Sequence, residues 1–122
     1  MGEMAKGTAP LDALEAFAID LPGAFRDMPW EEDAVAKVGK KIFVFFGSGG
    51  EDPAISVKLP ESADHALSIP GARPTSYGLG RHGWVTVPVT GTSTDLLQDW
   101  IEESYRTIAS KTLVAELDAR VT

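Results

Sequence analysis

Arg81 and His82 form the adjacent pair of residues in this sequence that is best suited to chemistry. A histidine titrates near pH 6.5, so His82 could act as a general base, and beside an arginine it could contact a phosphate. Catalysis would also need a serine, a cysteine or a paired carboxylate at a recognisable spacing, and none accompanies His82. We therefore interpret His82 as a structural or ligand-contacting residue, and we expect a protein that is not an enzyme.

The other polar motifs also favour structural roles. His65 precedes His82 by 17 residues and the chain has no cysteine, so the sequence predicts no metal site, and we expect no cofactor. Residues 47–50 (Gly-Ser-Gly-Gly) resemble a phosphate-binding loop but lack the following lysine, hydroxyl residue and helix, so we predict a hairpin turn. Ser104 and Tyr105 are interpreted as a small packing residue and a tyrosine that reaches back to the sheet.

Length, charge and apolar content describe one globular domain. The 122 residues are 43% hydrophobic, which suits a single compact core over residues 1–122, and we expect residues 1–8 to be flexible. The net charge of −7 argues against a strong nucleic-acid binder, although residues 37–94 carry six bases against four acids. The first ten residues hold no apolar run and the longest such run is Ile42–Phe46, so we expect a cytoplasmic protein with no membrane partner.

The first half of the chain predicts a helix followed by a strand meander. Apolar residues recur at helical spacing from Thr8 to Leu21, and Pro22-Gly23 ends that helix. Residues 24–33 predict a short edge strand and a turn. Ala34–Val38 and Lys41–Gly47 predict a hairpin around Gly39-Lys40, and the alternation of Ala54–Leu59 predicts a further strand.

The second half predicts a short helix, a strand and two helices. Pro60-Glu61 opens the short helix, and Val85, Val87 and Val89 alternate with Trp84, Thr86 and Pro88 along the last strand. Thr92 and Asp95 predict a capping box at the start of a long amphipathic helix, and a further helix follows. This order predicts an α+β fold in which an antiparallel sheet carries helices on one face.

The opposite face of that sheet is expected to be open. Ile42–Phe46 is apolar throughout, so either Phe43 and Phe45, or Ile42, Val44 and Phe46, point away from the helices. Together with Trp84 these side chains would form an aromatic platform for stacked bases or an apolar ligand. The basic residues expected at its edge are Lys37, Lys41, Lys58 and Arg81. Alternatively, loops, the segment around Trp30 or a second copy of the chain cover this face.

Five segments, in order along the chain, resemble the MmcQ/YjbR family. They are Leu21-Pro22-Gly23, residues 37–43 (Lys-Val-Gly-Lys-Lys-Ile-Phe), Val57-Lys58, residues 78–87 (Gly-Leu-Gly-Arg-His-Gly-Trp-Val-Thr-Val) and Ser104-Tyr105. The resemblance implies a CyaY-like, double-wing α+β fold and a DNA-binding role. This sequence has Leu79-Gly80 where many relatives place Asn-Lys, and Gly83 separates His82 from Trp84.

We interpret the chain as a non-enzymatic binding module, with nucleic acid, bound weakly, as the ligand that the resemblance implies. The alternatives are a receptor for a small apolar or planar molecule or a peptide, and a protein-interaction or dimerisation module, so the chain is a monomer or a homodimer. The expected ligand-binding residues are Lys37, Lys41, Phe43, Phe45, Lys58, Arg81, His82 and Trp84.

Overall fold

The computed structural model describes residues 9–28, 34–47, 53–76 and 78–121. Within them the order of elements is α1 (Ala9–Ile19), β1 (Ala24–Asp27), β2 (Ala34–Val38), β3 (Lys41–Gly47), β4 (Ala54–Lys58), α2 (Ala63–Leu67), β5 (Arg73–Pro74), the short 3-10 helix η2 (Leu79–His82), β6 (Trp84–Pro88), α3 (Thr94–Ile108) and α4 (Lys111–Val121). The predicted flexible segment 1–8, the Thr8 cap, the segment around Trp30 and the Gly49-Gly50 turn lie outside the described residues.

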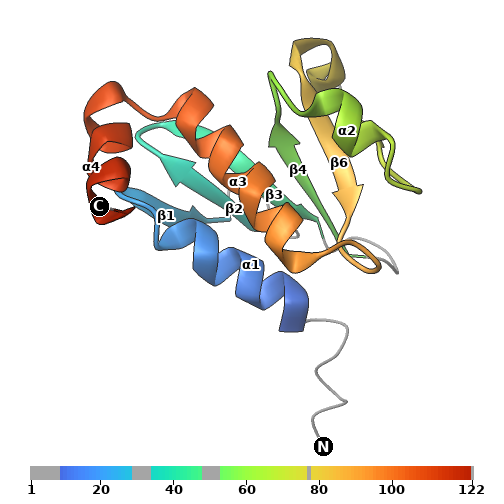
Figure 1. The fold of residues 1–122 in the computed structure, drawn as a ribbon, viewed down its shortest axis with the longest axis horizontal. Helices are drawn as coiled ribbons and strands as arrows, with labels where there is room; N and C mark the ends of the chain where they lie inside the picture. Colours follow the sequence, from blue (N-terminus) through green and yellow to red (C-terminus); the bar gives the residue numbers. More distant parts are fainter. Residues whose placement is uncertain (1–8, 29–33, 48–52, 77, 122) are drawn as a thin grey trace, which may run out of the picture.

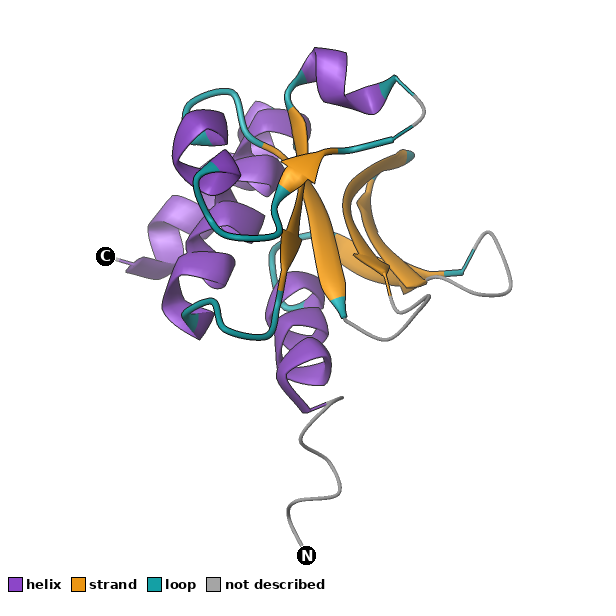
Figure 2. Cartoon of the chain, turned by 90° about the vertical axis from the view of Figure 1, so that its right-hand side faces the viewer, coloured by secondary structure: helices purple, strands orange, loops and turns teal. Residues whose placement is uncertain are grey.

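The strands form one antiparallel sheet in the order β1-β2-β3-β4-β6-β5. Helices α1 and α3 cross one face of this sheet, as Figure 1 shows, and Figure 2 shows the strongly curved sheet with the helices gathered on that side. The predicted α+β fold, with helices packed on one face of an antiparallel sheet, is confirmed.

Most element boundaries follow the sequence pattern, and three features differ from it. The hairpin strands β2 and β3 begin and end where they were predicted. The two-residue strand β5 and the 3-10 helix η2 were not predicted, because the glycine-rich segment that holds η2 has no periodicity. The predicted capping box of α3 is wrong: Ser93 caps the helix through Leu96 N, while the Thr92 hydroxyl donates to Pro88 O.

A β-bulge in β3 decides which aromatic residues enter the core. Ala36 pairs with Val44 but Lys37 pairs with Ile42, so Phe43 has no partner on β2. Phe43 and Val44 are therefore both buried on the helix side, where the Phe43 ring meets Tyr105 edge-on at 5.4 Å. Both predicted arrangements of Ile42–Phe46 are wrong, because Ile42 and Phe45 point away from the helices while Phe43, Val44 and Phe46 point towards them.

Ser104 and Tyr105 on α3 satisfy the backbone groups that this irregular region leaves unpaired. The fully buried Ser104 hydroxyl donates to Phe43 O at 2.6 Å and accepts from Lys58 N at 2.9 Å. The β3–β4 register ends at the pair Val44 and Val57. The Ser104 hydroxyl bridges the next residue on each strand, Phe43 on β3 and Lys58 on β4. The Tyr105 ring reaches the sheet at Phe43, as predicted, whereas its hydroxyl donates to Pro22 O at 2.6 Å and joins α3 to the turn between α1 and β1. Ser104 differs from the prediction, because it bridges two backbone groups and is more than a small packing residue.

Replacing Ser104 by alanine is expected to cost roughly 2–4 kcal/mol of unfolding free energy, because a buried carbonyl and a buried N–H both lose their partner. Ser68→Ala is the matched control, since the exposed Ser68 hydroxyl donates only to His65 O, at the end of a short helix. Urea unfolding of both variants measures the difference. Equal losses in the two variants would show that the Ser104 bridge contributes nothing.

Tyr105→Phe is expected to lower stability by about 1 kcal/mol at pH 8 through the lost hydrogen bond. Burial, with a smaller effect from the Glu116 carboxylate, raises the pKa of Tyr105 above its ordinary value. The folded state therefore holds the phenol proton more tightly than the unfolded state, so the stabilisation is complete below about pH 10 and is lost as the pH rises further. Urea unfolding at pH 8 and pH 11 should show the difference between wild type and variant shrinking at the higher pH; a constant difference would contradict this assignment.

Candidate functional site

The sheet face turned away from the helices, here called the outer face, is the candidate site. One register row crosses all six strands on this face, and its members are Asp27, Val35, Phe45, Ser56, Thr86 and Arg73. The neighbouring positions on the same face include Lys37, Ile42, Lys58 and Trp84. The outer face is therefore apolar towards β2 and β3 and polar towards β4, β6 and β5.

The predicted platform of Phe43, Phe45 and Trp84 is wrong as an open surface, because Phe43 lies in the core and Phe45 packs against Trp84. The Phe45 ring meets Trp84 at 5.4 Å with an interplanar angle of 67°. Strand β4 lies between them, and its small residue Ser56, the register partner of Phe45, leaves room for the contact. Trp84 is only 8% exposed, and Phe45 is half-buried. Neither ring presents the open surface that base stacking needs.

Three hydroxyl groups form a linked cluster on the polar half of the outer face, here called the hydroxyl triad. Ser56 Oγ lies 2.8 Å from Thr86 Oγ1, and Thr75 Oγ1 lies 3.0 Å from the same Thr86 atom. The hydrogen bond from Thr75 N to Trp84 O, at 3.1 Å, holds Thr75 beside β6. Alternation placed Ser56 and Thr86 on the polar side of their strands, but the sequence carried no signal that they meet.

The predicted lysines lie in three different settings. Lys37 is on the outer face and pairs with Asp27 at 3.3 Å. Lys58 is half-buried on the outer face, directly opposite Trp84 on β6. Lys41 is exposed at the hairpin end, where its register partner is the core residue Val38, so it does not belong to the outer face. The structure thus keeps Lys37 and Lys58 together with Phe45 and Trp84, and it separates Lys41 and Phe43 from them.

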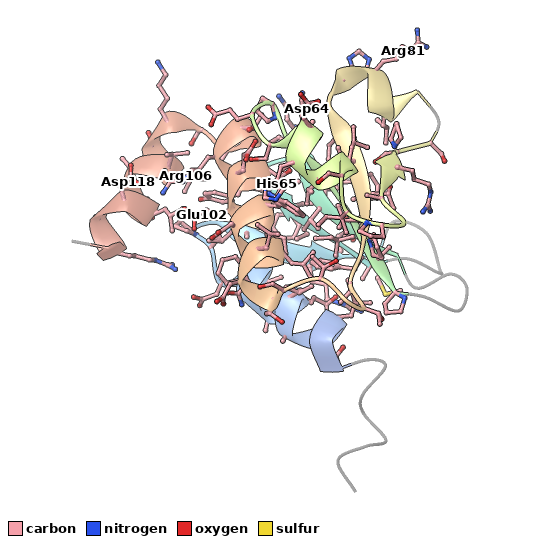
Figure 3. The ribbon with its side chains drawn as sticks, turned by 45° about the vertical axis from the view of Figure 1, so that its right-hand side comes forward. Asp64, His65, Arg81, Glu102, Arg106 and Asp118 are labelled. Atoms are coloured by element: carbon pink, nitrogen blue, oxygen red, sulfur yellow. The ribbon has the colours of Figure 1, made fainter. Side chains whose placement is uncertain are left out.

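Arg81 and His82 lie on η2, where both are exposed. Figure 3 shows Arg81 at an outer end of the molecule, projecting away from the helices. Gly78 and Gly83 flank η2 with φ values of 80° and 88°, a left-handed conformation that suits glycine. Gly80 packs so closely that an added Cβ would lie 2.7 Å from Pro74 Cβ. The glycines of this segment therefore dock η2 against β5, and within the described residues the side chains of Arg81 and His82 form no hydrogen bond or ion pair.

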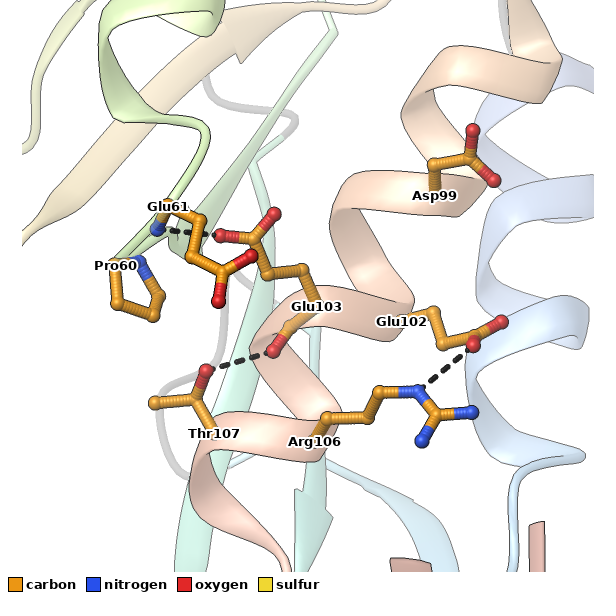
Figure 4. A pocket seen from close by; sticks show the side chains of 7 residues that line it. All are labelled: Pro60, Glu61, Asp99, Glu102, Glu103, Arg106 and Thr107. Atoms are coloured by element: carbon orange, nitrogen blue, oxygen red, sulfur yellow. Dashed lines mark hydrogen bonds and ion pairs between the residues drawn. The ribbon is translucent and has the colours of Figure 1, made fainter. Parts of the chain in front are cut away.

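A concavity lies between α3 and the turn that begins at Pro60, away from the outer face (Figure 4). It holds about 470 Å³ and is lined by Pro60, Glu61, Asp99, Glu102, Glu103, Arg106 and Thr107. The Glu103 carboxylate accepts hydrogen bonds from Glu61 N, Ser62 N and Ser62 Oγ, at 2.9, 3.1 and 2.6 Å. Arg106 pairs with Glu102 and Asp118, whose hydrogen bonds raise the pKa of the guanidinium further. These groups tie α3 to its neighbours in the fold.

Charge is distributed unequally between the sheet and the helices. The six strands and η2 carry six bases and one acid, whereas α1 to α4 carry three bases and nine acids. The bases of the strands and η2 are Arg26, Lys37, Lys41, Lys58, Arg73 and Arg81. Arg26 faces the helices and pairs with Glu15 of α1, and Lys37 pairs with Asp27. The excess positive charge of the outer face and η2 therefore comes from Lys58, Arg73 and Arg81, whereas the helices carry an excess of acids.

The described residues form neither a metal-binding cluster nor a membrane-spanning helix. Across the described ranges, no group of three or more histidine, cysteine, aspartate or glutamate side chains is arranged to hold a metal ion. No helix in the same part of the chain combines the length and the apolar character that crossing a bilayer requires.

Gly80→Ala is expected to lower stability by roughly 1–3 kcal/mol, because the new methyl group would overlap Pro74 Cβ and crowd Thr75 O at 3.1 Å. Gly47→Ala is the matched control, since the nearest atom to its new Cβ would be Ala54 O at an ordinary 3.5 Å. Thermal unfolding should give a clearly lower melting temperature for Gly80→Ala alone. If both variants melt with the wild type, η2 is not packed as tightly as described.

Comparison with known proteins places this architecture among solved structures. A crystal structure of a structural-genomics target protein from Pseudomonas syringae matches with a TM-score of 0.63 and 21% sequence identity, covering 79% of this chain and 96% of that one. This likeness shows a shared fold. No curated protein matches the chain.

The family model supplies the identity that the five sequence segments predicted. It spans residues 19–107, which include the β-bulge, the glycine segment around η2 and the Ser104-Tyr105 pair. Because the matched range covers well over half of the 122 residues, this chain belongs to the YjbR family.

Proposed function

We propose that this protein is a non-enzymatic binding module whose outer face and η2 contact the phosphate backbone of nucleic acid. The observation that carries this proposal is the charge distribution, in which Lys58, Arg73 and Arg81 on the outer face and η2 have no ion-pair partner among the described residues, while the helices hold nine acids against three bases. Such a distribution favours a polyanion on the sheet side and repels it from the helices. The DNA-binding role that the family resemblance implies would then belong to the sheet side of the molecule.

The expected contacts are to phosphates, with little contribution from base stacking. Trp84 and Phe45 cover one another, so their rings offer little free surface for a base. Lys58, Arg73 and Arg81 have no ion-pair partner among the described residues, whereas Lys37 already pairs with Asp27. With about three phosphate contacts, the logarithm of the affinity should fall with the logarithm of salt concentration with a slope of about −2 to −3.

A non-enzymatic role is supported by the surroundings of His82. It is exposed on η2, and within the described residues no hydroxyl or carboxylate is hydrogen-bonded to it. A general base is normally held by an orienting partner and placed next to the group that it deprotonates. A cytoplasmic location, where nucleic acid is available, belongs to the same proposal.

A protein-interaction module is the second candidate, and an exposed sheet edge favours it. Strand β1 is at one end of the sheet, and near it Phe25 and Met28 are 44% and 42% exposed. An edge strand with exposed apolar side chains can pair with a strand of another chain. Light scattering that shows a stable dimer, together with no binding of oligonucleotides, would favour this candidate over the first.

Lys58→Gln is expected to weaken oligonucleotide binding by about three- to tenfold at low salt, since one phosphate contact is lost. Lys111→Gln on α4 is the matched control, because it changes the net charge equally on the electronegative helical side. Fluorescence anisotropy with labelled single- and double-stranded oligonucleotides, at salt concentrations that differ by about 20-fold, measures the affinity and its dependence on salt. No binding at micromolar protein in low salt would overturn the nucleic-acid proposal, and equal effects of the two variants would remove the outer face from it.

A further inference from the structure

We propose that the hydroxyl triad of Ser56, Thr75 and Thr86, flanked by Lys58 and Arg73, is a binding site for a single phosphate group. This inference rests on the proposed function and deepens it, because it assigns one backbone phosphate to one place on the outer face. The site combines side chains from three neighbouring strands or their ends, and a rigid sheet holds them in register.

The triad holds one hydroxyl proton more than its internal hydrogen bonds use. Three hydroxyls bring three protons, and the two contacts of 2.8 and 3.0 Å employ two of them, whichever atoms donate. The third O–H therefore has no acceptor within the triad. Among the described residues, no acceptor outside the triad is hydrogen-bonded to it. Thr86 is 8% exposed and its two neighbours are half-buried, so the free donor lies at a partly desolvated position open to a ligand oxygen.

Two cations flank the triad on the same face. Lys58 follows Ser56 by two residues on β4, which places both side chains on one side of the strand. Arg73 on β5 is the direct register partner of Thr86. Asp27, the one acid of the strands, lies four strands from β6 and is paired with Lys37. The ligand class that suits one spare hydroxyl donor between two unopposed cations is a tetrahedral oxyanion with several acceptor oxygens, namely a phosphate ester.

The aromatic pair makes the neighbouring surface apolar. Phe45 and Trp84 meet over Ser56, and Trp84 is directly opposite Lys58. Hydrogen bonds and charge interactions are stronger where nearby water is reduced. The Phe45–Trp84 contact, which removes the predicted stacking platform, therefore strengthens an adjacent polar site.

Thr86→Val tests the site, because it removes the central hydroxyl while it keeps the shape of the side chain. Thr107→Val is the matched control, since the exposed Thr107 hydroxyl donates only to Glu103 O of its own helix. Thr75→Val, at the half-buried end of the triad, is the second test variant in case Thr86→Val does not fold, which circular dichroism would reveal. Each protein is assayed with labelled oligonucleotide by anisotropy and with inorganic pyrophosphate by amide chemical shifts.

The expected result is a three- to tenfold loss of oligonucleotide affinity in Thr86→Val or Thr75→Val but not in Thr107→Val, with pyrophosphate shifting the amides of Ser56, Thr75 and Thr86 in the wild type. If oligonucleotide binds and the triad variants bind it equally well, the triad inference fails and the proposed function stands. If pyrophosphate binds at the triad and oligonucleotide does not bind, the proposed function fails and the phosphate site stands. If neither probe binds, both fail.

Discussion

The hydroxyl of Ser104 is the interaction on which the arrangement of this sheet depends. It donates to Phe43 O and accepts from Lys58 N, at the point where the β3–β4 register ends and the β3 bulge begins. Without a partner, these buried backbone groups would oppose the bulge by roughly 1–3 kcal/mol each. The bulge in turn directs Phe43 into the core against Tyr105 and leaves Phe45 on the outer face.

The burial of Phe43 in the core also determines which side chains the outer face carries. With Phe43 removed from it, Phe45 and Trp84 remain close enough to cover each other across Ser56. An antiparallel sheet with helices on one side would otherwise expose a large apolar patch, which soluble monomers avoid. On the β4, β6 and β5 side of the aromatic pair the accessible groups are polar and cationic, and this is the surface to which we assign the proposed anion binding.

The separation of charge connects this face with the family's glycine segment. Gly80 approaches Pro74 closely, and the flanking glycines adopt left-handed backbone conformations, so η2 is docked against β5 at the end of the same sheet. Arg81 and His82 are thereby carried on the sheet's side of the molecule, away from the acidic helices. The net charge of the whole chain conceals this local excess of positive charge, because most acids lie on helices and loops.

The sequence by itself determined the elements and the fold class, because hydrophobic period, glycine turns and capping residues act over a few neighbouring residues. The hairpin of β2 and β3, the alternation in β4 and the family segments could all be predicted in this way. Only the tertiary structure decided the orientation of Phe43, the Phe45–Trp84 contact and the hydroxyl triad. Ser104 meets Phe43 across 61 positions and Ser56 meets Thr86 across 30, and such contacts depend on strand register and a bulge that no local pattern encodes.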